Sequence, residues 1–325
     1  MERVSFAIVG NNFISDKFVE AVRETECAEV NAVFSRKEET ASLFADKHGI
    51  EKRYTDYDLM LSDPDVDAVY VASPTLCHKD HTIAALKAGK HVLCEKMIAA
   101  ELSEFIEMRK TAEERKLVLL EAMRPDFDGA FDLVKEALPK IGRIRRVSFD
   151  YCQYSSRYDK FKSGNVLNAF DPKMKNSALA DIGIYPLHMC VSLFGEPISL
   201  SSTSIFLNNG FEGAGSVMMN YGDMIAQINY SKITDNCSKS VIEGELGSIL
   251  IDKFNAPTEI TLKLRSGEEY SIGYRAVENN MIFETEAFCD MINGRKSESA
   301  YLDISEITMR LVDKIYLSSG ISARF

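Results

Sequence analysis

The segment GNNFIS at residues 10–15 is the first part of the chain whose residue types could bind a charged ligand. It follows the apolar run VSFAIV and precedes a segment with helical spacing, and a dinucleotide-binding turn at such a place has the pattern G-x-G-x-x-G. There the first glycine makes the turn, the second lets a pyrophosphate approach the backbone, and the third allows close helix packing. Gly10 is the first glycine, and Ser15 is a small residue at the third position. A plain strand-to-helix turn is the alternative interpretation.

Asn12 stands where the second glycine would be. Asparagine tolerates a positive φ better than other residues that carry a Cβ, so the turn can still form. We expect its side chain to occupy space where a phosphate would come close, while the start of the next helix remains an anion site. The predicted phosphate-binding residues are Gly10, Asn11, Asn12, Phe13 and Ile14.

Ser35 and Arg36 end the second predicted strand, roughly 20 residues after the turn. NAD-binding domains usually carry an acidic residue here, which binds the ribose 2′-hydroxyl. A hydroxyl and a guanidinium suit a 2′-phosphate instead, because arginine offers two parallel donors to such a group. We therefore predict that Ser35 and Arg36 bind the cofactor and that NADP(H) is preferred over NAD(H). A solvated start of the next helix is the alternative.

Glu95 and Lys96 fall at the carboxyl end of the short strand predicted at HVLCE, residues 91–95. Open α/β sheets bind ligands at the carboxyl ends of their strands, so both residues are candidates for a ligand site. Taken alone, a lysine after a strand is more often solvated than catalytic.

The elements that must position these residues alternate between residues 3 and 122. Helical spacing covers 14–25, 37–48, 77–89 and 101–115, and apolar runs such as VNAVFS, VDAVYVAS and LVLLEA lie between and after these segments. Strands that alternate with helices predict right-handed βαβ units and a parallel sheet. We expect an N-terminal Rossmann domain at residues 1–123, in which a parallel sheet is doubly wound.

The pattern changes after Arg124. A helical stretch at 126–138 leads to RIRRVSFDYCQYSS, runs of period 2 follow within 199–275, and 279–293 and 303–319 have helical spacing again. Adjacent strands separated by Gly, Asn or Asp turns predict a large open mixed or antiparallel sheet. We expect an α+β domain for substrate binding and oligomerisation at residues 124–325, with the ligand site in a cleft between the two domains.

Composition excludes several classes of protein. A net charge of -11 argues against nucleic acid as the partner, because phosphate contacts need a basic face. No window approaches the roughly 20 apolar residues of a membrane helix. Seven scattered cysteines without a C-x-x-C pair suit a reducing compartment, and with no secretory signal pattern we expect a cytoplasmic protein. His78 and His81 share a helix face, but no acidic or cysteine cluster completes a metal site, so no metal is expected.

Three longer segments resemble the Gfo/Idh/MocA oxidoreductases, the family of glucose-fructose oxidoreductase and inositol dehydrogenase. The string SPTLCHKDHTIAALKAGKHVLCEK at 73–96 resembles the family signature without a gap. SRKEETASLFADKHG at 35–49 and LADIGIYPLHMCVSLFGEP at 179–197 resemble two further family segments. The resemblance covers about residues 3–200, and its closest motifs are those of the NADP-dependent dihydrodiol and D-xylose dehydrogenase and glucose-fructose oxidoreductase group.

The resemblance implies roles for individual residues. Lys96 inherits the place of the lysine that lies beside the nicotinamide and hydrogen-bonds the reacting oxygen. Asp181 and Tyr185 inherit the acidic and the proton-carrying positions, and their spacing of four puts both on one helical face. Glu95, Ser73, Pro74 and His78 are then expected near the cofactor, although His78 could instead be structural.

The resemblance also implies the reaction. Hydride transfer at a carbinol carbon needs the hydroxyl proton removed, and Tyr185 could carry it with its pKa lowered by the Lys96 ammonium. Arg124 and His188 are weaker candidates for contact with substrate. A domain-boundary salt bridge is an equal alternative for Arg124, and a core position is an equal alternative for His188.

Three positions depart from the family pattern: Asn12, Met97 in place of the proline after Glu-Lys, and Asn176-Ser177 in place of a glycine run. The expected function is NADP(H)-dependent oxidoreduction at a carbinol or carbonyl carbon of a sugar, polyol or similar small hydroxylated substrate. The alternative is a catalytically silent family member that binds a nucleotide or sugar as a sensor or partner subunit. A homodimer or higher homo-oligomer through the C-terminal sheet is expected.

Overall fold

The computed structural model describes residues 3–274 and 276–321. The chain divides into two units: residues 1–124 with 278–306, and residues 125–277 with 307–325. The last of the three breaks, after residue 306, falls inside one helix, α10 (Ser299–Ser319).

The first unit is built on a six-stranded sheet in the order β3-β2-β1-β4-β5-β6, and every neighbouring pair is parallel. This is the doubly wound Rossmann order, so the expected fold class is confirmed. Apart from the three-residue edge strand KRY at 52–54, the strands are largely apolar, because both faces of a parallel sheet are covered. They are β1 (Val4–Val9), β2 (Ala28–Phe34), β3 (Lys52–Tyr54), β4 (Ala68–Val71), β5 (His91–Glu95) and β6 (Leu119–Ala122).

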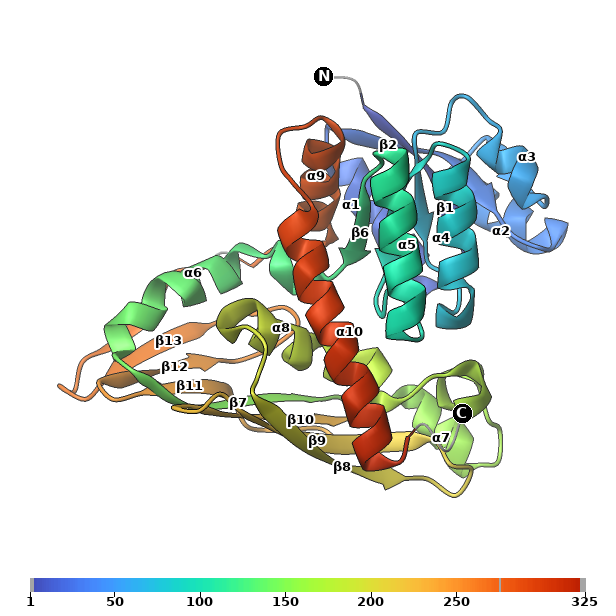
Figure 1. Cartoon of the computed structure of the whole chain (residues 1–325). Helices are drawn as coiled ribbons and strands as arrows, with labels where there is room; N and C mark the ends of the chain where they lie inside the picture. The colour runs from blue at the N-terminus through green and yellow to red at the C-terminus, as the bar shows by residue number, and fades with distance from the viewer. Residues whose placement is uncertain (1–2, 275, 322–325) are drawn as a thin grey trace. The chain divides into compact units, whose positions relative to one another are not determined.

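Helices connect these strands and bury aromatic side chains against them. Phe18 of α1 stacks on Tyr70 of β4 with 3.8 Å between ring centroids, and Phe6 of β1 meets Phe18 edge-on at 5.2 Å. Figure 1 shows α4 and α5 side by side along the sheet. The helices are α1 (Phe13–Glu24), α2 (Glu38–His48), α3 (Tyr57–Leu61), α4 (His78–Lys87) and α5 (Leu102–Arg115).

The helix α9 (Met281–Ile292) belongs to the first unit although it lies far along the sequence. Its Phe288 ring lies 5.7 Å from that of Phe6, and the helix packs beside α1. The chain therefore does not divide into two continuous segments at residue 123, because 278–306 return to the first unit. Hydrophobic spacing predicts that this segment is a helix, but it does not indicate which of the two sheets the helix covers.

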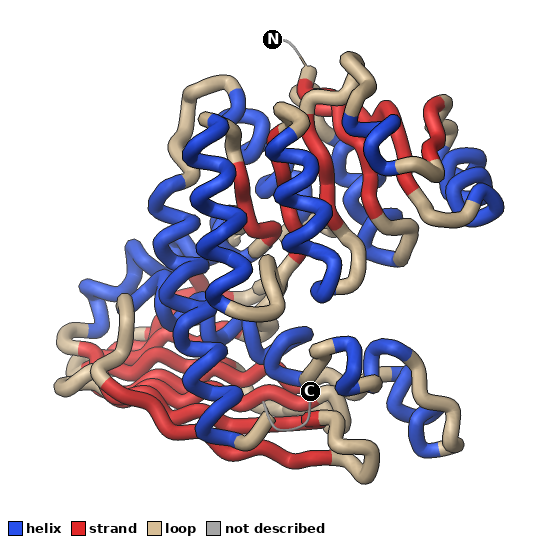
Figure 2. Tube along the Cα trace, turned by 45° about the vertical axis from the view of Figure 1, so that its right-hand side comes forward, coloured by secondary structure: helices blue, strands red, loops and turns tan. Residues whose placement is uncertain are grey.

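The second unit is built on an eight-stranded sheet in the order β14-β13-β12-β11-β7-β10-β9-β8, whose strands lie side by side in Figure 2. Only β7 and β10 pair in parallel, so this is the expected mixed sheet. The strands are β7 (Ile144–Cys152), β8 (Ser199–Phe206), β9 (Glu212–Asn220), β10 (Ile225–Ser231), β11 (Ser240–Gly244), β12 (Gly247–Ile251), β13 (Ile260–Leu264) and β14 (Glu269–Ile272).

One face of this sheet is covered and the other is open. Val147, Phe149, Ile228 and Ile242 are fully buried, and the unit's helices include α6 (Gly129–Ala137), α7 (Ser156–Lys162) and α8 (Ile184–Phe194). On the alternate positions Arg146 of β7 pairs with Glu243 of β11 as an exposed ion pair. The period-2 pattern in the sequence has this physical origin. No helix among the described residues meets the length and hydropathy of a membrane span.

Candidate active site

Gly10 makes the turn after β1 with a φ of 104°. A Cβ on this residue would lie 2.5 Å from the carbonyl oxygen of Ala72, so only glycine fits at this place. Ser15, at the third position of the pattern, is fully buried and donates its hydroxyl to the carbonyl of Gly10 at 2.7 Å. The first and third positions of the pattern thus keep their physical roles.

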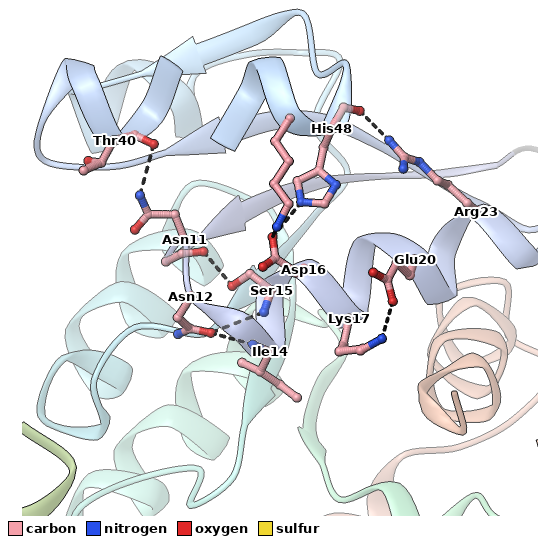
Figure 3. Close-up of polar contacts among 12 residues, drawn as sticks. Asn11, Asn12, Ile14, Ser15, Asp16, Lys17, Glu20, Arg23, Thr40 and His48 are labelled. Carbon is pink, nitrogen blue, oxygen red and sulfur yellow. Dashed lines mark hydrogen bonds and ion pairs between the residues drawn. The ribbon is translucent and has the colours of Figure 1, made fainter. Parts of the chain in front are cut away.

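Asn12 is the N-cap of α1, which the sequence did not reveal. Its backbone is extended, with φ -109° and ψ -178°, and does not need the left-handed conformation that asparagine tolerates. Its Oδ1 accepts hydrogen bonds from the N–H groups of Ile14 at 2.9 Å and Ser15 at 3.3 Å (Figure 3). Its Nδ2 donates to the carbonyl of Ala72 at 2.8 Å. The side chain therefore competes for the N–H donors that a phosphate at a helix start would use.

Asp16 joins α1 to α2. His48 Nε2 lies 2.7 Å and Lys47 Nζ 2.8 Å from the same carboxylate oxygen, and Arg23 donates to the carbonyl of His48 (Figure 3). Burial alone would raise the pKa of Asp16, but the hydrogen bonds from Lys47 and His48 outweigh it and lower the pKa. Asp16 is thus an anionic link that fixes the start of α1.

Thr40, which the sequence analysis missed, brings two predicted cofactor segments together. Its hydroxyl donates to the carbonyl of Lys37 at 2.9 Å, so the 2.6 Å contact with Ser35 is a hydrogen bond that Ser35 donates. Asn11 Nδ2 donates to the carbonyl of Thr40 at 3.1 Å (Figure 3). Asn11 and Ser35 therefore converge on one residue, and Arg36 beside them is exposed.

Glu95 fixes the backbone from which Lys96 projects. The Tyr70 hydroxyl donates to Glu95 Oε1 at 2.6 Å, and the Lys96 N–H donates to Glu95 Oε2 at 3.3 Å. The peptide bond between Lys96 and Met97 is cis although residue 97 is not proline. Lys96 itself is half-buried at the carboxyl end of β5.

The segment after Lys96 is held by two buried side chains. His78 lies with Nδ1 2.9 Å from the carbonyl of Met97 and Nε2 2.8 Å from the carbonyl of Ser73. Glu121, at the end of β6, accepts the Ile98 N–H at 3.0 Å. His78 is 1% exposed, so it acts here as a clamp between two loops, whereas Pro74 is exposed.

Arg124 lies close enough to a buried acidic cluster to affect its titration. Glu284 of α9 is fully buried; burial raises its pKa well above the ordinary value, the charge of Glu95 raises it further, and the charge of Arg124 lowers it. Arg124 also lowers the pKa of Tyr70, which burial and Glu95 raise. Arg124 therefore acts on Glu284 and Tyr70 through its charge.

Asp181 and Tyr185 lie in the second unit, around the junction of a π-helical turn (Leu179–Gly183) and α8. π-Turns inside helices are frequent at functional sites. A Cβ on Gly183 would lie 2.7 Å from the Tyr230 ring, which explains the glycine of the Asp-x-Gly motif. Tyr185 is 4% exposed, and its ring lies 5.8 Å from that of Tyr151.

Lys232 is the second residue that the sequence analysis missed. Its Nζ lies 2.8 Å from Asp181 Oδ2, and its side chain is 4% exposed while that of Asp181 is 37% exposed. Lys232 follows β10 in sequence, so only the topology brings it to Asp181. The only feature of the sequence that could have indicated Lys232 is its position directly after a strand with alternating hydrophobicity.

His188 is fully buried. Its Nε2 lies 2.5 Å from Asp126 Oδ2, and its Nδ1 lies 3.4 Å from the Thr308 hydroxyl. The burial and these contacts fit the core alternative for His188. No group of three or more His, Cys, Asp or Glu suited to a metal occurs in the described part of the chain.

The first unit combines a parallel sheet in Rossmann order, a turn glycine (Gly10) that no residue with a Cβ can replace, and a helix that begins directly after this turn. These features define a dinucleotide-binding protein. The model of the oxidoreductase family with an NAD-binding Rossmann fold matches residues 4–123, and the model of the GFO/IDH/MocA C-terminal domain matches 133–250. The chain belongs to the Gfo/Idh/MocA oxidoreductase family. Membership makes it an NAD(P)-dependent oxidoreductase of CH–OH substrates.

Three relatives match most of the chain. It is 39% identical to scyllo-inositol 2-dehydrogenase (NADP(+)) IolU of Bacillus subtilis over 91% of this chain and 90% of that protein. It is 35% identical to the uncharacterized oxidoreductase YgjR of Escherichia coli over 98% and 97%. It is 29% identical to trans-1,2-dihydrobenzene-1,2-diol dehydrogenase of Sus scrofa over 79% and 77%.

A solved structure shares the fold at lower identity. The 3-ketoreductase KijD10 of Actinomadura kijaniata, in complex with NADP and TDP-benzene, has a TM-score of 0.87 at 20% identity. The match covers 98% of both chains.

Proposed function

We propose that this protein is an NADP(H)-dependent oxidoreductase that transfers hydride to or from a ring or chain carbon of a polyol or sugar. The observation that carries the proposal is the seating of Lys96 at the carboxyl end of β5, where Glu95 and His78 fix the backbone on both sides of it. Such preorganisation is what a catalytic ammonium requires, because a mobile lysine would stabilise an oxyanion weakly.

Three side chains carry the proposed chemistry. Lys96 hydrogen-bonds the reacting oxygen and stabilises its anionic character. Tyr185 moves the hydroxyl proton, and Asp181 orients the substrate through its partly exposed carboxylate. The nicotinamide supplies the hydride acceptor or donor when bound.

The proposed preference for NADP(H) rests on the end of β2. Ser35 and the exposed Arg36 stand where an acid would bind a ribose 2′-hydroxyl, and no acidic residue occupies either position. The Gly10 turn and the start of α1 would hold the pyrophosphate. The relative IolU is named for NADP(+), which supports the same choice.

The proposed substrate class follows from the relatives. IolU is named for scyllo-inositol, and the dihydrodiol dehydrogenases are named for a vicinal ring diol. Both are six-membered rings that carry neighbouring hydroxyl groups. We propose a cyclic polyol or sugar of this kind.

The test is turnover by the purified protein with scyllo-inositol, myo-inositol and a panel of aldoses, followed at 340 nm. Reduction of NADP+ with at least one of these substrates is expected. Cofactor binding without turnover on any of them would mean a silent, sensor-like protein and would contradict the proposal. A fluorescence titration in which NADH bound at least as tightly as NADPH would contradict the assignment of Ser35 and Arg36.

We propose a cytoplasmic homo-oligomer. The location is supported by seven cysteines that are all free. The assembly is supported by large apolar side chains on the open face of the second sheet, where Ile205, Met218 and Ile225 are 59%, 41% and 51% exposed.

A further inference from the structure

Lys232 is a buried cation in the second unit. Its backbone is fixed on both sides, since its N–H donates to the carbonyl of Gly213 at 2.9 Å and its carbonyl accepts from Ser155 at 2.9 Å. Its side chain is 4% exposed. Burying an ammonium costs several kcal/mol unless partners compensate it, so its surroundings must supply them.

The partners surround the Lys232 ammonium on several sides. It lies 4.8 Å from the centroid of the Phe170 ring and 5.3 Å from that of Phe211, which are cation–π distances. It donates to the carbonyl of Ala169 at 3.0 Å. Its counter-ion is Asp181, at 2.8 Å.

The pair is asymmetric. The Asp181 side chain is 37% exposed, whereas Lys232 is almost completely enclosed. The two aromatic rings and the Ala169 carbonyl hold the Lys232 ammonium independently of Asp181. The Asp181 carboxylate is placed against this fixed cation. An ion pair between two exposed side chains has no such fixed partner and contributes little.

Stability alone does not explain a charge at this position. An apolar side chain would pack against Phe170 and Phe211 without the cost of desolvation, and such replacements of buried ion pairs are often neutral or stabilising. The surroundings therefore fit a residue kept for its charge.

We propose that Lys232 is a positioning residue for catalysis, which fixes the direction of the Asp181 carboxylate toward the substrate. The inference rests on the proposed role of Asp181 in the polyol reaction. Lys232 acts through Asp181 and does not itself meet the substrate.

The first test is a double-mutant cycle on the full-length protein, with Lys232→Met, Asp181→Asn and the double variant. Lys232→Met should lower kcat about 10- to 100-fold, because a misplaced orienting group costs about that much. NADPH affinity should stay unchanged. In the Asp181→Asn background Lys232→Met should have little further effect on kcat, since residues in one interaction are non-additive.

Two further variants separate positioning from folding. Lys232→Arg keeps a cation and should retain more activity than Lys232→Met. Lys52→Met removes a comparable ion pair, in which Nζ lies 2.8 Å from Asp63 Oδ2 on another element, and should lower thermal stability without changing kcat. An unchanged kcat in Lys232→Met, or an equal loss in both backgrounds, would overturn the inference.

A crystal structure of Lys232→Met gives a readout that does not depend on turnover. The Asp181 carboxylate should leave its native position while the π-turn at 179–183 stays intact. A carboxylate that keeps its place would overturn the positioning role. Absence of turnover in the wild-type protein would contradict the proposed function, and the position of Asp181 in this variant would still decide the role of Lys232.

Discussion

Asn12 shows how one side chain can satisfy a helix start that other proteins leave for a phosphate. Its Oδ1 bonds two N–H groups at the beginning of α1, and its Nδ2 ties the turn to the end of β4 through Ala72. A pyrophosphate that approaches this helix would have to displace those bonds or bind beside them. We therefore propose that Asn12 limits the affinity for the cofactor.

We predict that Asn12→Gly tightens NADPH binding several-fold. Glycine is an acceptable N-cap, so the variant should lose only a few tenths of a kcal/mol of stability while the N–H groups of Ile14 and Ser15 become available. The measurement is a fluorescence titration with NADPH. Asp56→Gly, which removes the cap of α3, is the matched control and should leave NADPH affinity unchanged.

Weaker binding of NADPH to Asn12→Gly would contradict this account. The Asn12 amide would then have to contact the phosphate directly.

At the scale of elements, the sequence predicted most of the fold. Alternating apolar runs and amphipathic segments predicted five strands of the first sheet and four of the helices that connect them. Strands and helices differ in hydrophobic period and in length, so the sequence distinguishes them. The three-residue edge strand β3 was not predicted, since so short a strand has no periodicity to detect. The attachment of α9 to the first unit depends on tertiary packing of Phe288 on Phe6, which no local pattern encodes.

The candidate site was predictable only where its residues belong to a motif. Gly10 and Lys96 stand in recognisable strings, whereas Thr40 and Lys232 reach their partners through packing. The capping role of Asn12 was not predicted, because the position was interpreted through the glycine pattern of phosphate-binding turns. Asparagine is also a favoured N-cap residue, and this second role belongs to the helix N–H groups. His188 was ambiguous because helical spacing from Asp181 does not show which way a helix faces.

We predict that Glu284→Gln stabilises the protein. Burial raises the pKa of Glu284, so it is protonated in the folded state at a pH where the unfolded chain, with a pKa of about 4.3, is ionised. The favourable difference is complete below the unfolded pKa and is lost as pH rises toward the folded pKa. Glutamine does not titrate, so the gain in Tm over wild type should grow from pH 5 to pH 8, reaching a few degrees.

Differential scanning calorimetry at several pH values checks this prediction. Glu286→Gln, on an exposed position of the same helix, is the control and should show no such trend. A lower Tm for Glu284→Gln at pH 8 would mean that the carboxylate is ionised and paired, contrary to the account.

In the whole molecule, the open face of the second sheet exposes large apolar side chains, and the fold of one chain does not explain why they are apolar. Met218 of β9 is paired with Ser201 of β8 and with Gln227 of β10, so these side chains share one face of the sheet. Ile205 and Ile225 lie an even number of residues from those partners and therefore point to the same open face. Exposed apolar positions on three adjacent strands are typical of a protein–protein interface. The proposed homo-oligomer would cover them.

We predict that Ile225→Lys converts the assembly to monomers at micromolar concentration, because a charge at a covered apolar position is costly. Light scattering coupled to size-exclusion chromatography measures the mass. Leu59→Lys, which changes an exposed apolar residue of α3, should leave the mass unchanged. A wild-type protein that is already monomeric would refute the proposed interface.

We propose that Lys96 stabilises the reacting oxygen in a polyol oxidoreductase. The most direct test of this proposal is kcat of Lys96→Met with NADP+ and the substrate that the panel assay identifies, beside Lys87→Met as an exposed lysine control. We predict a loss of about 10²- to 10³-fold or more in kcat for Lys96→Met, with NADPH affinity within about twofold of wild type and kcat of Lys87→Met unchanged. A Lys96→Met variant that turns over at the wild-type rate would contradict it.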